Sequence, residues 1–129
     1  MTDSLDRLYQ AVQAARDGDP ATSRTARLMQ AGRGKMAKKM AEEAVEVVID
    51  TVYGDTAAVV RESADLMYNL VVLWVAAGVR PEDVWAEMDR RERLLGIAEK
   101  IPKHMLASAE PAPRRKVVAL ATQRLRKRR

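Results

Sequence analysis

The chain has 129 residues, enough for one domain, and its 47% hydrophobic and 32% charged residues suit a soluble, folded, helical protein. It contains no cysteine, which excludes a disulfide framework and thiolate chemistry and fits a cytoplasmic protein. The net charge of +5 comes from residues 111–129, which hold eight Lys or Arg and no acid, so the slightly acidic remainder of the chain is not expected to bind nucleic acid.

Two short helices are predicted in the N-terminal part of the chain. Apolar residues at helical spacing favour a first helix from about Ser4, its expected cap, to about Arg16. After a loop, Thr22 or Ser23 can cap a second helix that ends near Gln30.

Two long helices are predicted next, over about residues 35–53 and 56–77. Gly54 and Gly78 fit their C-terminal ends, and Asp55 can cap the second of them. The apolar side of the first long helix comprises Met36, Met40, Ala44, Val47, Val48 and Val52.

The helix over residues 56–77 is apolar nearly all round, which predicts that it is buried. One short subunit cannot readily cover so much apolar surface, so we expect a homo-oligomer, most simply a two-fold dimer. A fifth helix is predicted from Pro81, which fits a first helical turn, to about Leu94. The sequence therefore predicts an all-α bundle of four to five helices that is completed by dimerisation.

The predicted organisation is a helical domain over residues 1–103 and a basic tail over residues 104–129. The tail has the pattern of a basic amphipathic helix over 116–127. It is the segment through which any binding of nucleic acid is expected. No signal peptide and no apolar stretch of membrane-spanning length are evident, so we expect no membrane contact.

Two acidic clusters on the long helices are the most informative feature of the sequence. Glu42, Glu43 and Glu46 share one face of the first, and Glu62 and Asp65 lie three residues apart on the second. An antiparallel arrangement would let these five carboxylates converge. Carboxylates among core-packing residues are costly unless a cation neutralises them, so the pattern predicts a Mg²⁺ site.

These clusters also carry a resemblance to a known family. The residues that carry it are 18–20, 23–28, 38–47 and 62–70, with the later segment 96–100. Together they resemble the phosphoribosyl-ATP pyrophosphatase family, within the all-α nucleotide pyrophosphohydrolase superfamily that is marked by EExxE followed by ExxD. The resemblance implies a helical dimer or a higher oligomer.

The resemblance also implies an activity and a set of site residues. The activity is cleavage of phosphoribosyl-ATP to phosphoribosyl-AMP and pyrophosphate in histidine biosynthesis, with Mg²⁺ or Mn²⁺. The implied metal ligands are Glu43, Glu46, Glu62 and Asp65. Glu42 would be a further ligand or the base that orients water, so the implied catalytic residues are Glu42, Glu43 and Glu46. The implied substrate contacts are Arg24, Lys38, Lys39 and Asn69.

The chain departs from the family pattern at three positions. It has Arg24 where the family usually has Tyr, Ala41 where it usually has Gly, and Asn69 where it usually has His. None of these changes removes an implied metal ligand. Two alternatives stay open at this point: a pyrophosphohydrolase of the same fold that acts on other, non-canonical nucleoside triphosphates, and a non-catalytic helical binding module.

Overall fold

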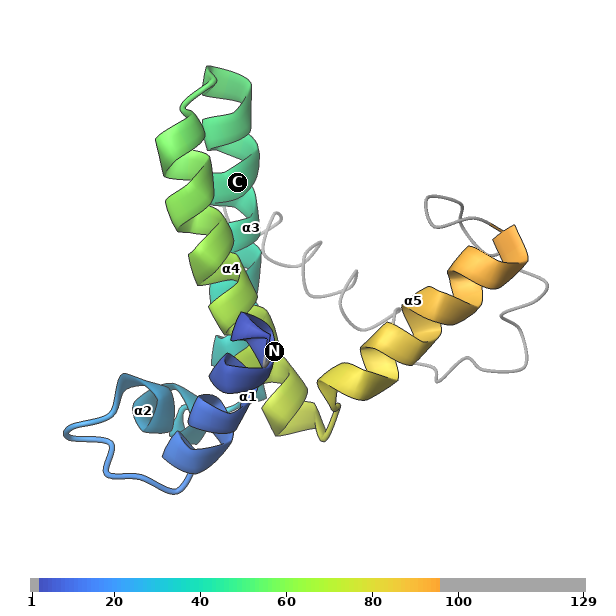
Figure 1. The fold of residues 1–129 in the computed structure, drawn as a ribbon. Helices are drawn as coiled ribbons and strands as arrows, with labels where there is room; N and C mark the ends of the chain where they lie inside the picture. The colour runs from blue at the N-terminus through green and yellow to red at the C-terminus, as the bar shows by residue number, and fades with distance from the viewer. Residues whose placement is uncertain (1–2, 96–129) are drawn as a thin grey trace, which may run out of the picture. The chain divides into compact units, whose positions relative to one another are not determined.

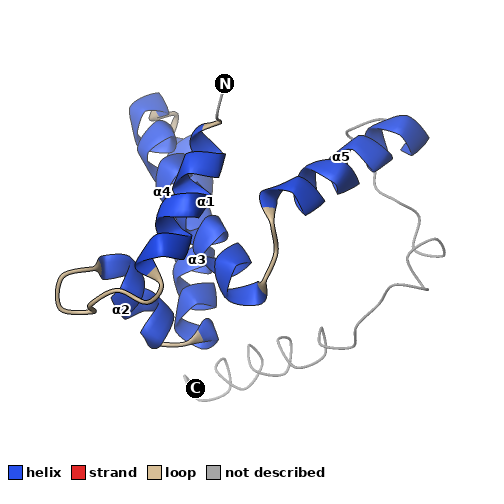
Figure 2. Ribbon diagram, turned by 60° about the horizontal axis from the view of Figure 1, so that its bottom comes forward, coloured by secondary structure: helices blue, strands red, loops and turns tan. Residues whose placement is uncertain are grey.

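The computed structural model describes residues 3–95, and within them it contains five α-helices and no strand (Figures 1 and 2). The helices are α1 (Ser4–Ala15), α2 (Arg24–Gln30), α3 (Arg33–Tyr53), α4 (Thr56–Ala77) and α5 (Pro81–Leu95). The all-α prediction is confirmed, and the predicted helices lie within two residues of these bounds.

Two of the three predicted N-terminal helix caps are present. Ser23 Oγ accepts from the backbone N–H of Ala26 at 3.1 Å, and Asp55 Oδ1 accepts from that of Ala58 at 3.0 Å. The prediction that Ser4 caps α1 is wrong, because Asp3 Oδ1 accepts from the backbone N–H of Leu5. Gly54 ends α3 in the left-handed region, at φ 77°.

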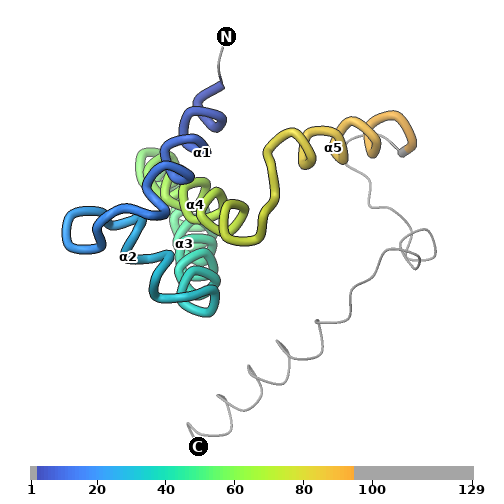
Figure 3. The backbone as a smooth tube through the Cα atoms, turned by 90° about the horizontal axis from the view of Figure 1, so that it is seen from below, coloured from blue at the N-terminus to red at the C-terminus, as the bar shows by residue number. Residues whose placement is uncertain are grey.

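Helices α3 and α4 form an antiparallel hairpin and make the most extensive helix contact of the described residues. They run side by side in Figures 1 and 3, joined by a tight turn at Gly54 and Asp55. Because the chain reverses over two residues, positions equally far from the turn on the two helices face one another. Glu46 lies eight residues before Gly54 and Glu62 seven residues after Asp55, so the turn brings the two acidic clusters to nearly the same level.

Helices α1 and α2 cover only the part of the hairpin that lies away from the turn (Figure 1). The buried cluster under them consists of Leu5, Val12, Leu28, Met36, Val71, Val72 and Val75. On α4, however, Val60 and Met67 are exposed. The expectation that α4 is buried is therefore wrong at these two positions, which nothing in the described residues covers.

Helix α3 carries two apolar stripes rather than one apolar side. Met36 is buried and Met40, Ala44 and Val47 are half-buried, but Val48 and Val52 are 61% and 80% exposed. The expected apolar side of α3 is thus correct for its first four residues and wrong for its last two. At about 100° per residue, Val52 points about 180° away from the buried Glu43.

Helix α5 begins with Pro81 in its first turn, as predicted. Trp74 and Trp85 meet edge to face with ring centroids 6.2 Å apart, and both pack against the core cluster. The chain divides within α5 into two compact units, residues 1–87 and 88–129. The predicted boundary at 103/104 and the basic tail lie outside the described residues.

None of the described helices is by itself long and apolar enough to span a membrane. Among the described helices, α4 and α5 together have the length and composition of one broken span.

Candidate metal centre

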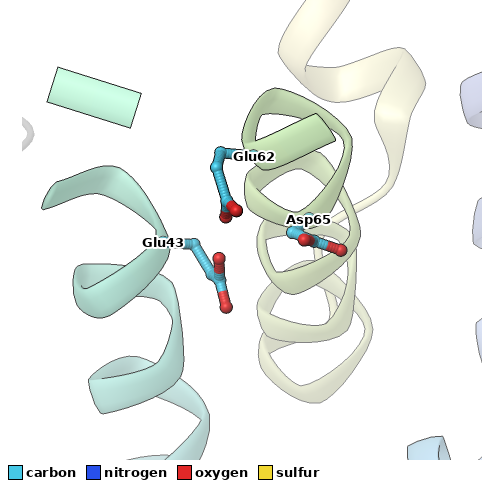
Figure 4. A group of neighbouring side chains, drawn as sticks. All are labelled: Glu43, Glu62 and Asp65. Carbon is cyan, nitrogen blue, oxygen red and sulfur yellow. The ribbon is translucent and has the colours of Figure 1, made fainter. Parts of the chain in front are cut away.

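Three of the predicted ligands come together between α3 and α4. One carboxylate oxygen from each of Glu43, Glu62 and Asp65 lies within 4.8 Å of the other two. In Figure 4 the side chains of Glu43 and Glu62 point toward one another across the space between the helices, and Asp65 lies next to them on α4. This convergence follows from the antiparallel hairpin and the spacing of three residues between Glu62 and Asp65.

Burial differs sharply among the three carboxylates. Glu43 is buried, Glu62 is half-buried and Asp65 is exposed. Among the described residues, the buried oxygens Glu43 Oε2 and Glu62 Oε2 have no hydrogen-bond donor. Since buried oxygens without a donor are costly, these two atoms indicate a cationic group that belongs in the site.

The electrostatics of Glu62 lead to the same conclusion. Its carboxyl can share a proton with Glu46 and with Glu43, and these bonds, partial burial and the two negative charges raise its pKa from 4.5 to about 7. Among the described residues no donor reaches Glu43 Oε2 or Glu62 Oε2, so a shared proton is the hydrogen bond left to these two oxygens. A divalent cation can replace the proton and neutralise the group more completely.

The other predicted acidic residues lie at the edge of this group. Glu46 is exposed but close enough to Glu62 to share its proton. Glu42 is exposed, and its Oε1 lies 3.9 Å from Lys38 Nζ one helical turn away. Lys39 is half-buried. The group of three converging oxygens therefore includes neither Glu42 nor Glu46, and the roles predicted for these two stay predictions.

Two predicted substrate-binding residues, Asn69 and Arg24, make contacts on α4 within one helical turn of Asp65. Asn69 is only 2% exposed, and its Nδ2 donates to the backbone carbonyl of Asp65 at 2.8 Å. The guanidinium of Arg24 lies over the ring of Tyr68, 5.9 Å from the ring centroid. Within one chain, then, Arg24 is exposed over the ring of Tyr68, whereas Asn69 supports the turn that presents Asp65.

Tyr68 and Thr25 are the residues near the site to which the sequence analysis gave no role. Tyr68 Oη and Thr25 Oγ1 are 2.6 Å apart and link the start of α2 to α4. The spacing of three residues from Asp65 is a signal that points to Tyr68. No sequence spacing points to Thr25, because the contact joins residues 43 positions apart.

An open hollow of about 350 Å³ lies near the ends of α1 and α4, away from the three carboxylates. Its lining residues are Arg16, Met29, Gln30, Gly32, Arg33, Met36 and Ala76. The carboxylate group shows much the stronger chemistry, because it combines converging oxygens with buried atoms that lack a donor. We therefore take the carboxylate group as the candidate site.

Comparison with known proteins gives a family match and close relatives. The family described as phosphoribosyl-ATP pyrophosphohydrolase matches residues 5–92. The chain is 69% identical over 131 residues to phosphoribosyl-ATP pyrophosphatase 2 of Rhodopseudomonas palustris, covering 100% of each chain. It is 68% identical to the protein of the same name from Bradyrhizobium diazoefficiens, over 99% of each. It is 55% identical over 96 residues to phosphoribosyl-ATP pyrophosphatase of Azospirillum brasilense, covering 74% of this chain and 86% of the relative.

Proposed function

Because this chain belongs to the phosphoribosyl-ATP pyrophosphohydrolase family, we propose that its carboxylate site carries out the reaction from which the family takes its name. The chain is a phosphoribosyl-ATP diphosphatase of histidine biosynthesis, which hydrolyses phosphoribosyl-ATP to phosphoribosyl-AMP and pyrophosphate. The convergence of oxygens from Glu43, Glu62 and Asp65 within 4.8 Å carries the assignment of this reaction to the site. Two buried oxygens there that lack a donor among the described residues support it.

The donor set fits Mg²⁺, with Mn²⁺ as an alternative. Mg²⁺ prefers hard oxygen ligands, and Glu43, Glu62 and Asp65 offer carboxylates from two rigid helices. When bound, the cation supplies charge neutralisation for the phosphates and lowers the pKa of a bound water. We propose Glu46 as the fourth ligand, because it lies close enough to Glu62 to share its proton.

The remaining proposed roles follow from position and charge. Glu42 can accept a proton from the attacking water or act as a further ligand, since its contact with Lys38 at 3.9 Å is long and solvent-exposed. Lys38, Lys39 and Arg24 are the cations proposed to bind the phosphate oxygens as negative charge develops on them. We also propose that Asn69 contacts the substrate. Because its side-chain amide is buried, the helical turn around it would have to move to expose the amide.

We also propose that the protein forms a homodimer through α3. Val45, Val48, Ile49 and Val52 recur at helical spacing and are each at least 46% exposed. A second copy is the natural partner for this stripe, because a long helix with matched apolar residues can pair with itself about a two-fold axis. Val60 and Met67 form a smaller exposed apolar pair on α4 that a higher oligomer would use.

The first experiment for the function is pyrophosphate release from phosphoribosyl-ATP, compared with a panel of nucleoside triphosphates at equal concentration. We expect selective turnover of phosphoribosyl-ATP that requires Mg²⁺ or Mn²⁺ and stops with EDTA. Turnover of the other triphosphates alone would instead assign the protein to a different substrate of the same fold. Absence of pyrophosphate release from every substrate would remove the enzymatic assignment.

We also propose a cytoplasmic location, which cell fractionation would test.

A further inference from the structure

Tyr68 is a neighbour of Asp65 on α4 and contacts both Thr25 and Arg24 of α2. It lies three residues after Asp65 on α4, so the two side chains are neighbours on one helix. Its hydroxyl is 2.6 Å from Thr25 Oγ1, and its ring lies under the guanidinium of Arg24 at 5.9 Å. Thr25 and Arg24 are consecutive residues at the start of α2. Tyr68 is therefore held by Thr25 and supports Arg24, the residue before it.

Arg24 has the charge and the freedom to bind an anion. Within residues 3–95 it forms no ion pair, and its side chain is exposed. A guanidinium over an aromatic ring is oriented by the ring quadrupole while its N–H groups remain available at the edges. Those edges match two oxygens of a phosphate group, which is the bidentate geometry that arginine favours.

We propose that Tyr68 is a positioning residue, which orients Arg24 toward the phosphates of the substrate. The ring of Tyr68 restricts the guanidinium to one side of α4, and the contact with Thr25 fixes the ring. Arg24 then meets the phosphate chain with less loss of side-chain entropy than a free arginine would. This inference rests on the proposed function, since it takes a phosphate-bearing substrate at the carboxylate site.

A purely structural role for Tyr68 makes a different prediction. The residue is half-buried and packs against the core cluster, so its loss could lower activity by loosening α2. In that case the effect of its loss would not depend on the side chain at position 24. The two roles are therefore separated by a double-mutant cycle between Tyr68 and Arg24.

The experiment measures KM and kcat for phosphoribosyl-ATP in the full chain with saturating Mg²⁺. Turnover by the unmodified protein is established first, so that failure of the proposed function is seen before any variant is compared. We expect Arg24→Ala to raise KM about 10- to 100-fold, because it removes a charge-assisted contact. Tyr68→Leu should raise KM about two- to fivefold, the range of an exposed cation–π contact, with kcat nearly unchanged.

The decisive measurement is Tyr68→Leu in the Arg24→Ala background. We expect no further rise in KM there, because the group that Tyr68 positions is already gone. Tyr68→Phe keeps the ring and loses the Thr25 contact, so it should show a smaller rise that Thr25→Val reproduces. An equal effect of Tyr68→Leu with and without Arg24 would overturn the proposal, as would an unchanged KM in the single variant.

Tyr9 provides the matched control. It is a half-buried tyrosine of α1 that packs against the same core cluster. Tyr9→Leu therefore reproduces the loss of a tyrosine from this core without touching Arg24. We expect it to lower the melting temperature and to leave KM unchanged. A rise in KM for Tyr9→Leu equal to that for Tyr68→Leu would mean that KM reports core packing, and the proposal would fail.

Discussion

Glu43 is the most buried carboxylate of the site, and one of its oxygens has no donor within residues 3–95. We predict that Glu43→Gln loses more activity than the roughly 10- to 100-fold typical of second-layer residues around a metal, because a ligand itself is removed. The same change should raise the melting temperature of the metal-free protein, since it removes a negative charge packed against Glu62. Pyrophosphate release and thermal unfolding in EDTA provide the two measurements.

The control for this substitution is Glu82→Gln. Glu82 is an exposed glutamate in the first turn of α5, with no part in the carboxylate group. It should keep full activity. If Glu43→Gln lost activity together with stability, the loss would reflect misfolding, and our assignment of Glu43 as a ligand would lack support. Retained activity would remove Glu43 from the site.

The raised pKa of Glu62 predicts how stability depends on pH in the absence of metal. With a pKa of 4.5 when unfolded and about 7 when folded, Glu62 holds a proton between these values only in the folded protein. The free energy of unfolding should therefore fall as the pH rises from 4.5 to 7, and level off above that. Glu62→Gln cannot ionise, so its stability should fall less over the same window, as thermal melts in EDTA would record.

Magnesium provides the internal comparison for this prediction. At pH 8 Glu62 is ionised, so added Mg²⁺ should raise the melting temperature of the unmodified protein by mass action. It should raise that of Glu62→Gln much less, because one ligand is gone. A parallel change with pH in the stability of the unmodified protein and of Glu62→Gln, measured in EDTA, would contradict the prediction. That result would mean that the pKa of Glu62 is close to that of an ordinary glutamate.

Of the five carboxylates that the sequence predicts to converge, three do so, and the sequence predicts their surroundings poorly. Helical spacing alone places Glu62 and Asp65 on one face, and the two-residue turn then brings Glu43 to them. The contact between Tyr68 and Thr25 could not be predicted, because it depends on how α2 docks on α4. The burial of Asn69 was missed for the same reason, since helical spacing gives the face of a residue but not what covers that face.

At the scale of helices, the glycines of the hairpin differ in what their backbone requires. Gly54 has φ 77° and ends α3, whereas Gly34 lies inside α3 with no atom close to the position of an added Cβ. We predict that Gly54→Ala destabilises the protein by about 1 kcal/mol, because the left-handed region is strained for alanine. Gly34→Ala should stabilise it by about 0.5–1 kcal/mol.

Urea unfolding with a common m-value measures both changes, and each variant serves as the control for the other. The same chemical change should give opposite signs at the two positions. Equal signs would show that the backbone at one of them differs from the conformation described.

Gly34 also explains why the predicted start of α3 was two residues late. Glycine disfavours a helix, but the packing of Met36 outweighs one such residue.

End signals and apolar spacing were sufficient to predict the helix ends because those effects are local. Gly54 with Asp55 and Gly78 with Pro81 fixed the ends of α4 and the start of α5 correctly. The cap of α1 was misplaced by one residue because Asp3 and Ser4 are both good caps. Sequence periodicity placed Val48 and Val52 on an apolar side, but periodicity alone cannot separate a core stripe from an interface stripe.

At the scale of the whole molecule, the outward stripe of α3 points to assembly. The exposed positions Val45, Val48, Ile49 and Val52 lie on the face of α3 opposite to Glu43, so the hairpin cannot bury them itself. A row of four large apolar residues on one exposed helix face is uncommon in a monomer and marks an interaction surface. Glu43 and the stripe thus lie on opposite faces of one helix, so the proposed dimer would leave Glu43 free to bind a cation, whereas Glu42 lies about 20° from Ile49 and would border the interface.

This arrangement gives the last prediction, which concerns Val48→Lys combined with Val52→Lys. Two lysines would place like charges in the middle of the proposed interface, and their desolvation would oppose dimerisation. Light scattering after gel filtration should show a dimer for the unmodified protein and a monomer for the double variant. The matched control is Gln13→Lys, at an exposed position of α1, which should remain dimeric. A monomeric unmodified protein at tens of micromolar, or an unchanged mass for the double variant, would contradict an interface on α3. Because the substitutions lie on the face opposite Glu43, the binding of Mg²⁺ by the monomer would then report whether one chain holds a complete metal centre.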